Sequence, residues 1–239
     1  QKDLRRTIVL TGTRRVGKTT IQYQMIDRLL KKGVPPQKIL FVSMDHPMLK
    51  LSGLNDLLEC YHSNVYAVPD CYYFFDEIQY ASDWDKWMKT IYDMQPETKM
   101  VATGSASPAL MKGSSESGAG RWSVIQVPTL SFYEYCALIG ARVPELGPEI
   151  RPTAFLHMAQ QERTAVMIKL EEVQNYFMRY LRVGGFPELA LASDDLMAQQ
   201  IMREDVVDKV LKRDLPALYK IRSATELERI FLYLCNVSS

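Results

Sequence analysis

One stretch near the N-terminus constrains the fold of this chain more than any other. Residues 12–19 read Gly-Thr-Arg-Arg-Val-Gly-Lys-Thr and match the pattern G-x-x-x-x-G-K-[ST]. A short, apolar and β-branched run at 7–11 precedes the motif, and apolar side chains recur every four residues after it, over 18–32. This context predicts a buried strand, a tight loop and an amphipathic helix, with the loop N–H groups turned toward phosphate oxygens.

The loop residues have expected roles in phosphate binding. The residues expected to contact the phosphates are Gly12, Thr13, Arg14, Arg15, Val16, Gly17, Lys18, Thr19 and Thr20. Lys18 would reach the β- and γ-phosphates of a nucleotide, and the Thr19 hydroxyl would be a ligand of Mg²⁺. Arg14 and Arg15 either neutralise phosphate charge or face the solvent.

A pair of acidic residues follows a second apolar run. Phe74 and Phe75 lead directly into Asp76 and Glu77. In enzymes with such a phosphate-binding loop, an aspartate at the end of a hydrophobic strand can hold Mg²⁺. A glutamate directly after it can act as the general base that activates the attacking water. Solvated acids at a strand end are the plainer interpretation, but the position on the second strand after the loop favours the functional one.

Three single residues complete the candidate site. Ser105, just after a predicted strand, either senses the γ-phosphate or caps the next helix. Arg121, after Gly120, either stabilises charge in the transition state, from the same chain or from a neighbouring subunit, or is an exposed residue at a strand start. Asp45 follows the second strand at the same expected edge of the sheet, and its role is open.

The order of the predicted elements indicates the fold class. Strands are predicted at 7–11, 38–43, 72–75, 99–103 and 123–127, and helices at 18–32, near 53–60 and after Ser82. This alternation predicts an α/β fold of the P-loop NTPase class, with a parallel five-stranded sheet between helices. Helices alone are predicted later, at 131–139, 165–181, 194–212 and 223–235. We therefore expect an ATPase core over 1–140 and a small, all-helical, lid-like domain over 141–239.

Composition and charge exclude several classes of protein. Hydrophobic residues make up 47% of the chain and charged residues 24%, which is ordinary for a globular protein. The net charge is only +1, although residues 1–50 carry 11 basic and 3 acidic side chains, so positive charge gathers around the loop. No apolar run is long enough to cross a membrane. The four cysteines are scattered, which favours reduced thiols and a cytoplasmic location.

The remaining patterns argue against other chemistries. The three histidines have no metal-ligand partners at a workable spacing. The chain has no Asn-Lys-x-Asp pattern to read guanine, and no arginine-rich lid precedes the fifth strand. A GTPase and a small-molecule kinase are therefore the weaker hypotheses.

These motifs resemble those of the AAA+-like ATPases labelled AAA_14, which carry a C-terminal DUF4143 region. The matching stretches are 10–20, 75–79, 103–105, 120–121, Pro128 with 130–134, 184–188 (Gly-Gly-Phe-Pro-Glu) and 213–214. Thr13 stands where that group usually has proline. The chain also stops where the group usually continues into a winged-helix-like segment and a nuclease-like domain, so we expect a longer protein.

The resemblance implies an ATPase core that takes ATP and Mg²⁺. We expect ATP hydrolysis that drives a conformational switch or motor, with Lys18, Glu77, Ser105 and Arg121 as catalytic residues and with Thr19 and Asp76 at the metal. The alternative is an ATP-gated regulatory or DNA-associated module with little turnover. A homo-oligomer and a DNA or effector partner, bound through a missing C-terminal domain, are further expectations; a membrane is not.

Overall fold

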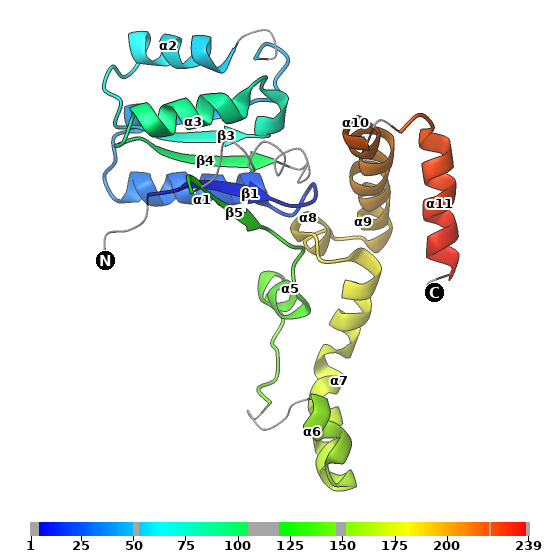
Figure 1. The fold of residues 1–239 in the computed structure, drawn as a ribbon. Helices are drawn as coiled ribbons and strands as arrows, with labels where there is room; N and C mark the ends of the chain where they lie inside the picture. Colours follow the sequence, from blue (N-terminus) through cyan, green and yellow to red (C-terminus); the bar gives the residue numbers. More distant parts are fainter. Residues whose placement is uncertain (1–4, 50–52, 105–119, 147–151, 220, 238–239) are drawn as a thin grey trace. The chain divides into compact units, whose positions relative to one another are not determined.

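The computed structural model describes residues 5–49, 53–104, 120–146, 152–219 and 221–237 (Figure 1). The chain divides into two compact units. The first consists of residues 1–128 together with 209–239, and the second consists of residues 129–208. The domain boundary expected at residue 140 stays a prediction. We describe each unit by itself.

A parallel sheet of five strands forms the centre of the first unit. The strands are β1 (Thr7–Thr11), β2 (Ile39–Ser43), β3 (Tyr72–Asp76), β4 (Lys99–Gly104) and β5 (Trp122–Gln126). Their order in the sheet is β2-β3-β4-β1-β5, and every neighbouring pair is parallel. The predicted α/β fold with a five-stranded parallel sheet is therefore confirmed. Because the strands are parallel, all their carboxyl ends lie at one edge of the sheet. The glycine-containing loop after β1 and Glu77 after β3 therefore begin at the same edge.

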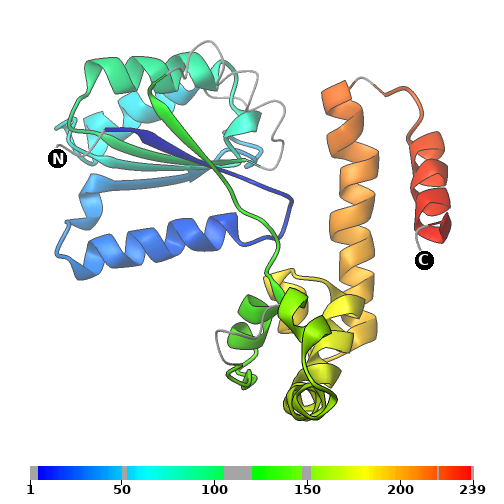
Figure 2. The ribbon, with the colours of Figure 1, turned by 60° about the horizontal axis from the view of Figure 1, so that its bottom comes forward.

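Helices cover both faces of this sheet (Figures 1 and 2). On one face, α1 (Lys18–Lys31) packs apolar side chains such as Ile21 and Met25 against Leu10 and Phe74. On the other face, α2 (Leu54–Asn64) and α3 (Trp84–Met94) form a larger core with alternate strand residues. Apolar residues therefore point to both faces of each central strand, which explains the uninterrupted apolar runs in the sequence.

Helix α3 begins after Ser82, as expected, but Ser82 is not its N-cap residue. The N-cap residue is Asp83, which has left-handed backbone geometry (φ 51°) and makes no side-chain capping bond. The Asp83 carboxylate instead accepts a bond from Lys86 Nζ at 2.7 Å. Trp84, Met88 and Ile91 are buried on one side of the helix and Trp87 is half-buried, so packing rather than side-chain capping stabilises this helix.

The first unit also contains the last part of the chain. The elements of this last part are η4 (Val210–Asp214), α10 (Leu215–Tyr219) and α11 (Ala224–Val237). Two short 3-10 helices, η1 (Pro36–Lys38) and η2 (Ile78–Tyr80), lie earlier in the same unit. The predicted helix over 194–212 is divided into α9 (Asp195–Ile201) and two π-helical segments, η3 (Met202–Asp208) and η4. A π-helix adds a residue per turn, a change of period that a simple hydrophobic pattern does not reveal.

The second unit is helical. Besides α9 and η3 it contains α5 (Phe132–Leu138), α6 (Pro152–His157), α7 (Gln160–Val183) and α8 (Pro187–Ala190). Arg179 connects its own helix α7 to α5, α8 and α9. Its guanidinium donates to Tyr135 Oη, to Asp195 Oδ1 and to the carbonyls of Ala190 and Ala192, at 2.6–2.9 Å. No helix in the described part of the chain is long and apolar enough to span a membrane.

The Gly-Gly-Phe-Pro-Glu stretch has a structural explanation in this unit. The Gly185 carbonyl accepts a hydrogen bond from the Leu130 N–H at 2.7 Å, and a Cβ atom on Gly185 would lie 2.3 Å from the Leu130 oxygen. Gly184 has φ 74° and ends α7. The two glycines therefore allow the chain to leave α7 and pass close to the segment that precedes α5.

Candidate functional site

The loop between β1 and α1 has the backbone geometry that the motif predicts. Gly12, Arg15 and Gly17 all have positive φ values, of 151°, 61° and 95°. A Cβ atom on Gly12 would lie 2.3 Å from the carbonyl oxygen of Val127, so no other residue fits there without displacing the chain just after β5. Successive turns of this kind bring backbone N–H groups to one side, where they form an anion-binding concavity.

Lys18 is the buried cation of this loop. Its side chain is only 5% exposed, and its Nζ donates to the carbonyls of Gly12 and Thr13 at 3.0 and 2.7 Å. Burial lowers the pKa of Lys18, while the nearby carboxylates of Glu77 and Asp76 oppose that shift. The ammonium is therefore held over the loop by neutral acceptors, with two acidic residues close enough to affect it.

The Asp76 carboxylate lies at the carboxyl end of β3 and meets two threonine hydroxyls. Thr19 Oγ1 lies 3.1 and 2.9 Å from its two oxygens, and Thr103 Oγ1 donates to Oδ1. Burial raises the pKa of Asp76, and these hydrogen bonds partly offset the shift. A buried carboxylate beside a hydroxyl is an oxygen donor set that suits Mg²⁺, so Thr19 and Asp76 fit the metal expected of them.

Thr103 is a site residue that sequence reasoning missed. It is fully buried on β4, and its hydroxyl both donates to Asp76 and accepts a bond from the Glu77 N–H at 3.1 Å. The signal was present, because Thr103 belongs to the Thr-Gly-Ser stretch from which Ser105 was selected. Ser105 itself lies outside the described residues.

Glu77 has an unusual backbone for its residue type. Its φ is 50°, in the left-handed region that glutamate rarely adopts. Gln79 Nε2 donates to its carboxylate, which holds that side chain beside the turn that follows β3. Such strained residues concentrate at functional sites. Asp45 lies at the same edge of the sheet, because it follows Ser43, which pairs with Asp76 in the register of β2 and β3. Its Oδ1 accepts a bond from the Ser43 hydroxyl at 2.7 Å.

The other loop residues differ in exposure and contacts. Val16 is buried, whereas Thr13 and Thr20 are exposed and Arg15 is partly buried. Arg14 does not face the solvent: its Nε and one terminal nitrogen each lie 2.8 Å from an oxygen of Asp214, and the same terminal nitrogen donates to Tyr80 Oη at 3.3 Å. The contact with Asp214 joins residues 200 positions apart, and no local pattern predicts it.

Arg121 lies at the amino ends of the strands, opposite the loop of its own chain, and its expected catalytic role stays a prediction. Its carbonyl accepts a bond from the Thr7 N–H, which places it at the amino ends of β1 and β5. A strand rises about 3.3 Å per residue, so the five residues of β1 separate this position from the loop by roughly 16 Å. Its guanidinium binds both oxygens of Asp93, at 2.9 and 3.2 Å. A role toward a neighbouring subunit stays a prediction.

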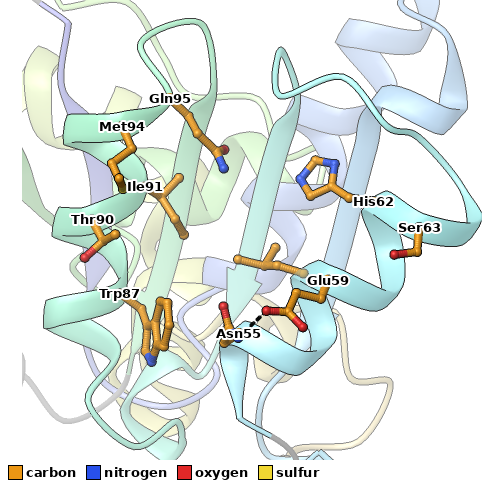
Figure 3. Close-up of a pocket in the computed structure, with 10 residues that line it drawn as sticks. Asn55, Glu59, His62, Ser63, Trp87, Thr90, Ile91, Met94 and Gln95 are labelled. Carbon is orange, nitrogen blue, oxygen red and sulfur yellow. Dashed lines mark hydrogen bonds between the residues drawn. The ribbon is translucent and has the colours of Figure 1, made fainter.

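A separate pocket of about 560 Å³ lies between α2 and α3 (Figure 3). It is lined by none of the loop residues. His62 at its edge has partners on both ring nitrogens: Nδ1 donates to the Tyr66 carbonyl at 2.7 Å, and Nε2 lies 2.6 Å from Tyr73 Oη. Within the described residues, no three His, Cys, Asp or Glu side chains gather into a metal-binding group, and the cysteines are free thiols.

Comparison with solved structures gives matches of low identity and low TM-score. A Walker-type ATPase of Pyrococcus abyssi is 12% identical over 98% of this chain and 71% of its own, with a TM-score of 0.42. AMPPCP-bound DnaA from Aquifex aeolicus is 12% identical over 99% of this chain and 83% of its own, with a TM-score of 0.44. At these values the likeness carries no argument about function.

Comparison by sequence identifies longer relatives. An uncharacterized protein of Methanocaldococcus jannaschii, MJ1544, is 25% identical over 96% of this chain and 46% of its own length. A second one from that organism, MJ1637, is 29% identical over 86% of this chain and 45% of its own. The chain thus spans about half the length of the curated relatives it matches.

Two family descriptions match the chain. Residues 174–239 match a domain of unknown function, DUF8612. Residues 4–136, which include the loop, all five strands and both acidic residues, match AAA_14, described as an AAA domain. With more than half of its residues in that match and with the parallel sheet and loop geometry described above, the chain belongs to the AAA_14 family.

Proposed function

We propose that this chain binds ATP with Mg²⁺ and hydrolyses it, as an AAA+-like core that works as a conformational switch or motor. The observation that carries the proposal is one cluster at the carboxyl edge of the sheet. There the buried Lys18 ammonium, the Thr19 hydroxyl and the Asp76 carboxylate lie together, and Glu77 follows Asp76 directly. A cation, a metal-binding pair and a candidate base are the groups that phosphoryl transfer to water requires.

The roles follow from the chemistry of each group. The loop N–H groups and Lys18 would bind the phosphates, and Thr19 and Asp76 would hold Mg²⁺. When bound, Mg²⁺ neutralises phosphate charge. Glu77 would accept a proton from the water whose oxygen attacks the γ-phosphorus, while the bond from that phosphorus to the bridging oxygen breaks and ADP leaves. Thr103 orients the Asp76 carboxylate and the Glu77 backbone.

Ser105 and Arg121 remain part of the proposal as catalytic residues, although neither belongs to the cluster described above. Ser105 would sense the γ-phosphate. Arg121 would act only across a subunit interface in a homo-oligomer, because its own chain holds it at the amino edge of the sheet.

The first experiment compares Mg²⁺-dependent ATP hydrolysis by the unchanged chain and by Glu77→Gln. We expect the variant to bind ATP with an affinity within about three-fold of the original and to lose about 10²-fold or more in turnover, as removal of a general base does. Glu97→Gln, at an exposed glutamate before β4, is the matched control and should change neither quantity. Equal turnover by Glu77→Gln and the unchanged chain would refute the assignment.

The Arg14–Asp214 contact favours a second candidate, a nucleotide-gated regulatory module with little turnover. A gate needs a link between the nucleotide loop and another segment, and this ion pair supplies one. Nucleotide binding without turnover above that of Glu77→Gln would select this alternative. A DNA partner is tested by the mobility shift of duplex DNA with a longer form of the protein. If this alternative is right, the shift should differ with and without ATP.

A further inference from the structure

Arg14 joins three segments of the first unit that are far apart in the sequence. We call Arg14, Tyr80 and Asp214 the Arg14 cluster. Arg14 belongs to the phosphate loop, Tyr80 ends η2 three residues after Glu77, and Asp214 is the last residue of η4. The guanidinium makes a two-point contact with the Asp214 carboxylate at 2.8 Å and a third contact with Tyr80 Oη at 3.3 Å.

The cluster is partly shielded from water. The side chains of Arg14 and Asp214 are 17% and 15% exposed. A fork of two N–H groups on two carboxylate oxygens is a strong and directional contact, and partial burial reduces its screening by salt. The Asp214 contact also raises the pKa of Arg14, so the guanidinium stays charged. The phosphate loop is thus bonded to the segment that continues into α10.

The cluster also lies within electrostatic range of the proposed phosphate site. The charges of both Arg14 and Asp214 act on the buried Lys18 ammonium, Asp214 favouring its charged form and Arg14 opposing it. A negative group that interacts electrostatically with Lys18 also interacts with a phosphate bound beside Lys18. Asp214 and a polyphosphate would repel each other, and both would attract Arg14.

We infer that Asp214 and the phosphates of a bound nucleotide compete for Arg14, so that nucleotide binding loosens the contact between the loop and the segment 210–219. The inference rests on the proposed nucleotide site and names a regulatory contact of that site. Coupling of this kind is reciprocal: a nucleotide that weakens the Asp214 contact must bind more tightly once that contact is removed. Tyr80 extends the effect to the segment that follows Glu77.

A purely positioning role for Asp214 predicts the opposite result. If Asp214 only held Arg14 in place for the phosphates, removing its charge would weaken nucleotide binding. The sign of the change in affinity therefore separates the two interpretations.

The decisive measurement is calorimetric binding of two probes, ADP with Mg²⁺ and inorganic tripolyphosphate, to the unchanged chain and to Asp214→Asn. We expect the variant to bind both probes about five-fold or more tightly, which is the low end of ordinary coupling. Asp93→Asn is the matched control, because it removes another two-point arginine contact in the same unit at the opposite edge of the sheet. Its affinities should stay within about two-fold.

Hydrogen exchange in residues 210–219 gives a second readout, which can be measured both with and without a probe. Exchange should be faster in Asp214→Asn than in the unchanged chain without any probe, and probe binding should accelerate it only in the unchanged chain. Arg14→Lys keeps the positive charge and loses the two-point contact, so it should also exchange faster, and it serves if Asp214→Asn does not fold.

The outcomes separate this inference from the proposed function. Equal or weaker probe binding by Asp214→Asn, with normal binding by the unchanged chain, overturns the inference alone. Identical exchange in 210–219 across all variants overturns it as well. If neither the unchanged chain nor Asp214→Asn binds either probe, the proposed nucleotide site fails, and the inference that rests on it fails too.

Discussion

At the scale of single residues, the surroundings of two candidate-site residues, Gly12 and Asp76, explain why each residue type is needed at its position. Gly12 combines a φ of 151° with a neighbouring carbonyl only 2.3 Å from where a Cβ would lie. Asp76 combines burial with two hydroxyl partners, which together set its pKa. Both residues were selected from the sequence for their chemistry, and their surroundings now predict measurable effects of changing them.

Gly12→Ala should destabilise the protein strongly. Backbone strain and the clash with Val127 together should cost at least about 3 kcal/mol of unfolding free energy. Gly33→Ala is the matched control: Gly33 also has positive φ, of 83°, but has open space around its Cβ position, so strain alone should cost about 1–2 kcal/mol. Urea denaturation measures both, and equal losses would contradict the role given to the Val127 contact.

Asp76 predicts a pH dependence of stability in metal-free buffer. Its pKa is raised in the folded chain, mainly by burial, so between the unfolded and the folded pKa the folded state holds a proton that the unfolded state has lost. The slope of unfolding free energy against pH is then negative. Stability due to Asp76 is therefore greatest in acid and falls as pH rises through the folded pKa. Denaturation measured at a series of pH values should show no such fall in unfolding free energy for Asp76→Asn. The same slope in the variant and the unchanged chain would refute the prediction.

At the scale of elements, capping explains one helix start and not another. In α5, Ser131 Oγ accepts from the Glu134 N–H at 3.3 Å and Glu134 Oε2 accepts from the Ser131 N–H at 2.8 Å, a reciprocal capping box. In α3, the serine expected at the start makes no capping bond, because Asp83 is the N-cap. The two serines look alike in sequence, since each has an acidic residue three positions later, Glu134 after Ser131 and Asp85 after Ser82.

Two serine substitutions should therefore differ. Ser131→Ala should lower the unfolding free energy by about 1 kcal/mol, the usual cost of losing a capping side chain. Ser82→Ala should change it by less than about 0.5 kcal/mol, as surface substitutions do. Thermal or urea denaturation of both variants checks the pair, and a larger loss from Ser82→Ala would show that the capping assignment is reversed.

At the scale of the whole molecule, the position of Arg121 separates action within one chain from action between chains. Its place at the amino edge of the sheet, beside Asp93, keeps it away from Lys18 of its own chain. Arg121→Ala should therefore leave ATP turnover of a dilute, monomeric sample within about two-fold of the original. If a neighbouring subunit receives this arginine, the loss grows as protein concentration rises.

Turnover measured across a dilution series, with sedimentation to report the oligomeric state, checks this expectation. A large loss by Arg121→Ala at every concentration, including that of the monomer, would contradict the separation seen in the structure.

The sequence alone was enough to predict the parallel sheet and the alternation of strands and helices, and to nominate the candidate residues at the carboxyl ends of the strands. Those features are local: a strand, a glycine loop and a helix are adjacent in the chain, and the residues after parallel strands must meet at one edge. Lys18, Thr19, Asp76 and Glu77 could therefore be selected from the order of residues along the chain.

Contacts between distant segments, by contrast, emerge only from the three-dimensional fold. The fold pairs Thr103 with Asp76, joins Arg14 to Asp214, and places Arg121 at the opposite edge, although all these residues stand beside recognisable motifs. The physical reason is that side-chain pairing depends on the position of each segment in space, whereas a sequence pattern reports only periodicity and neighbours along the chain.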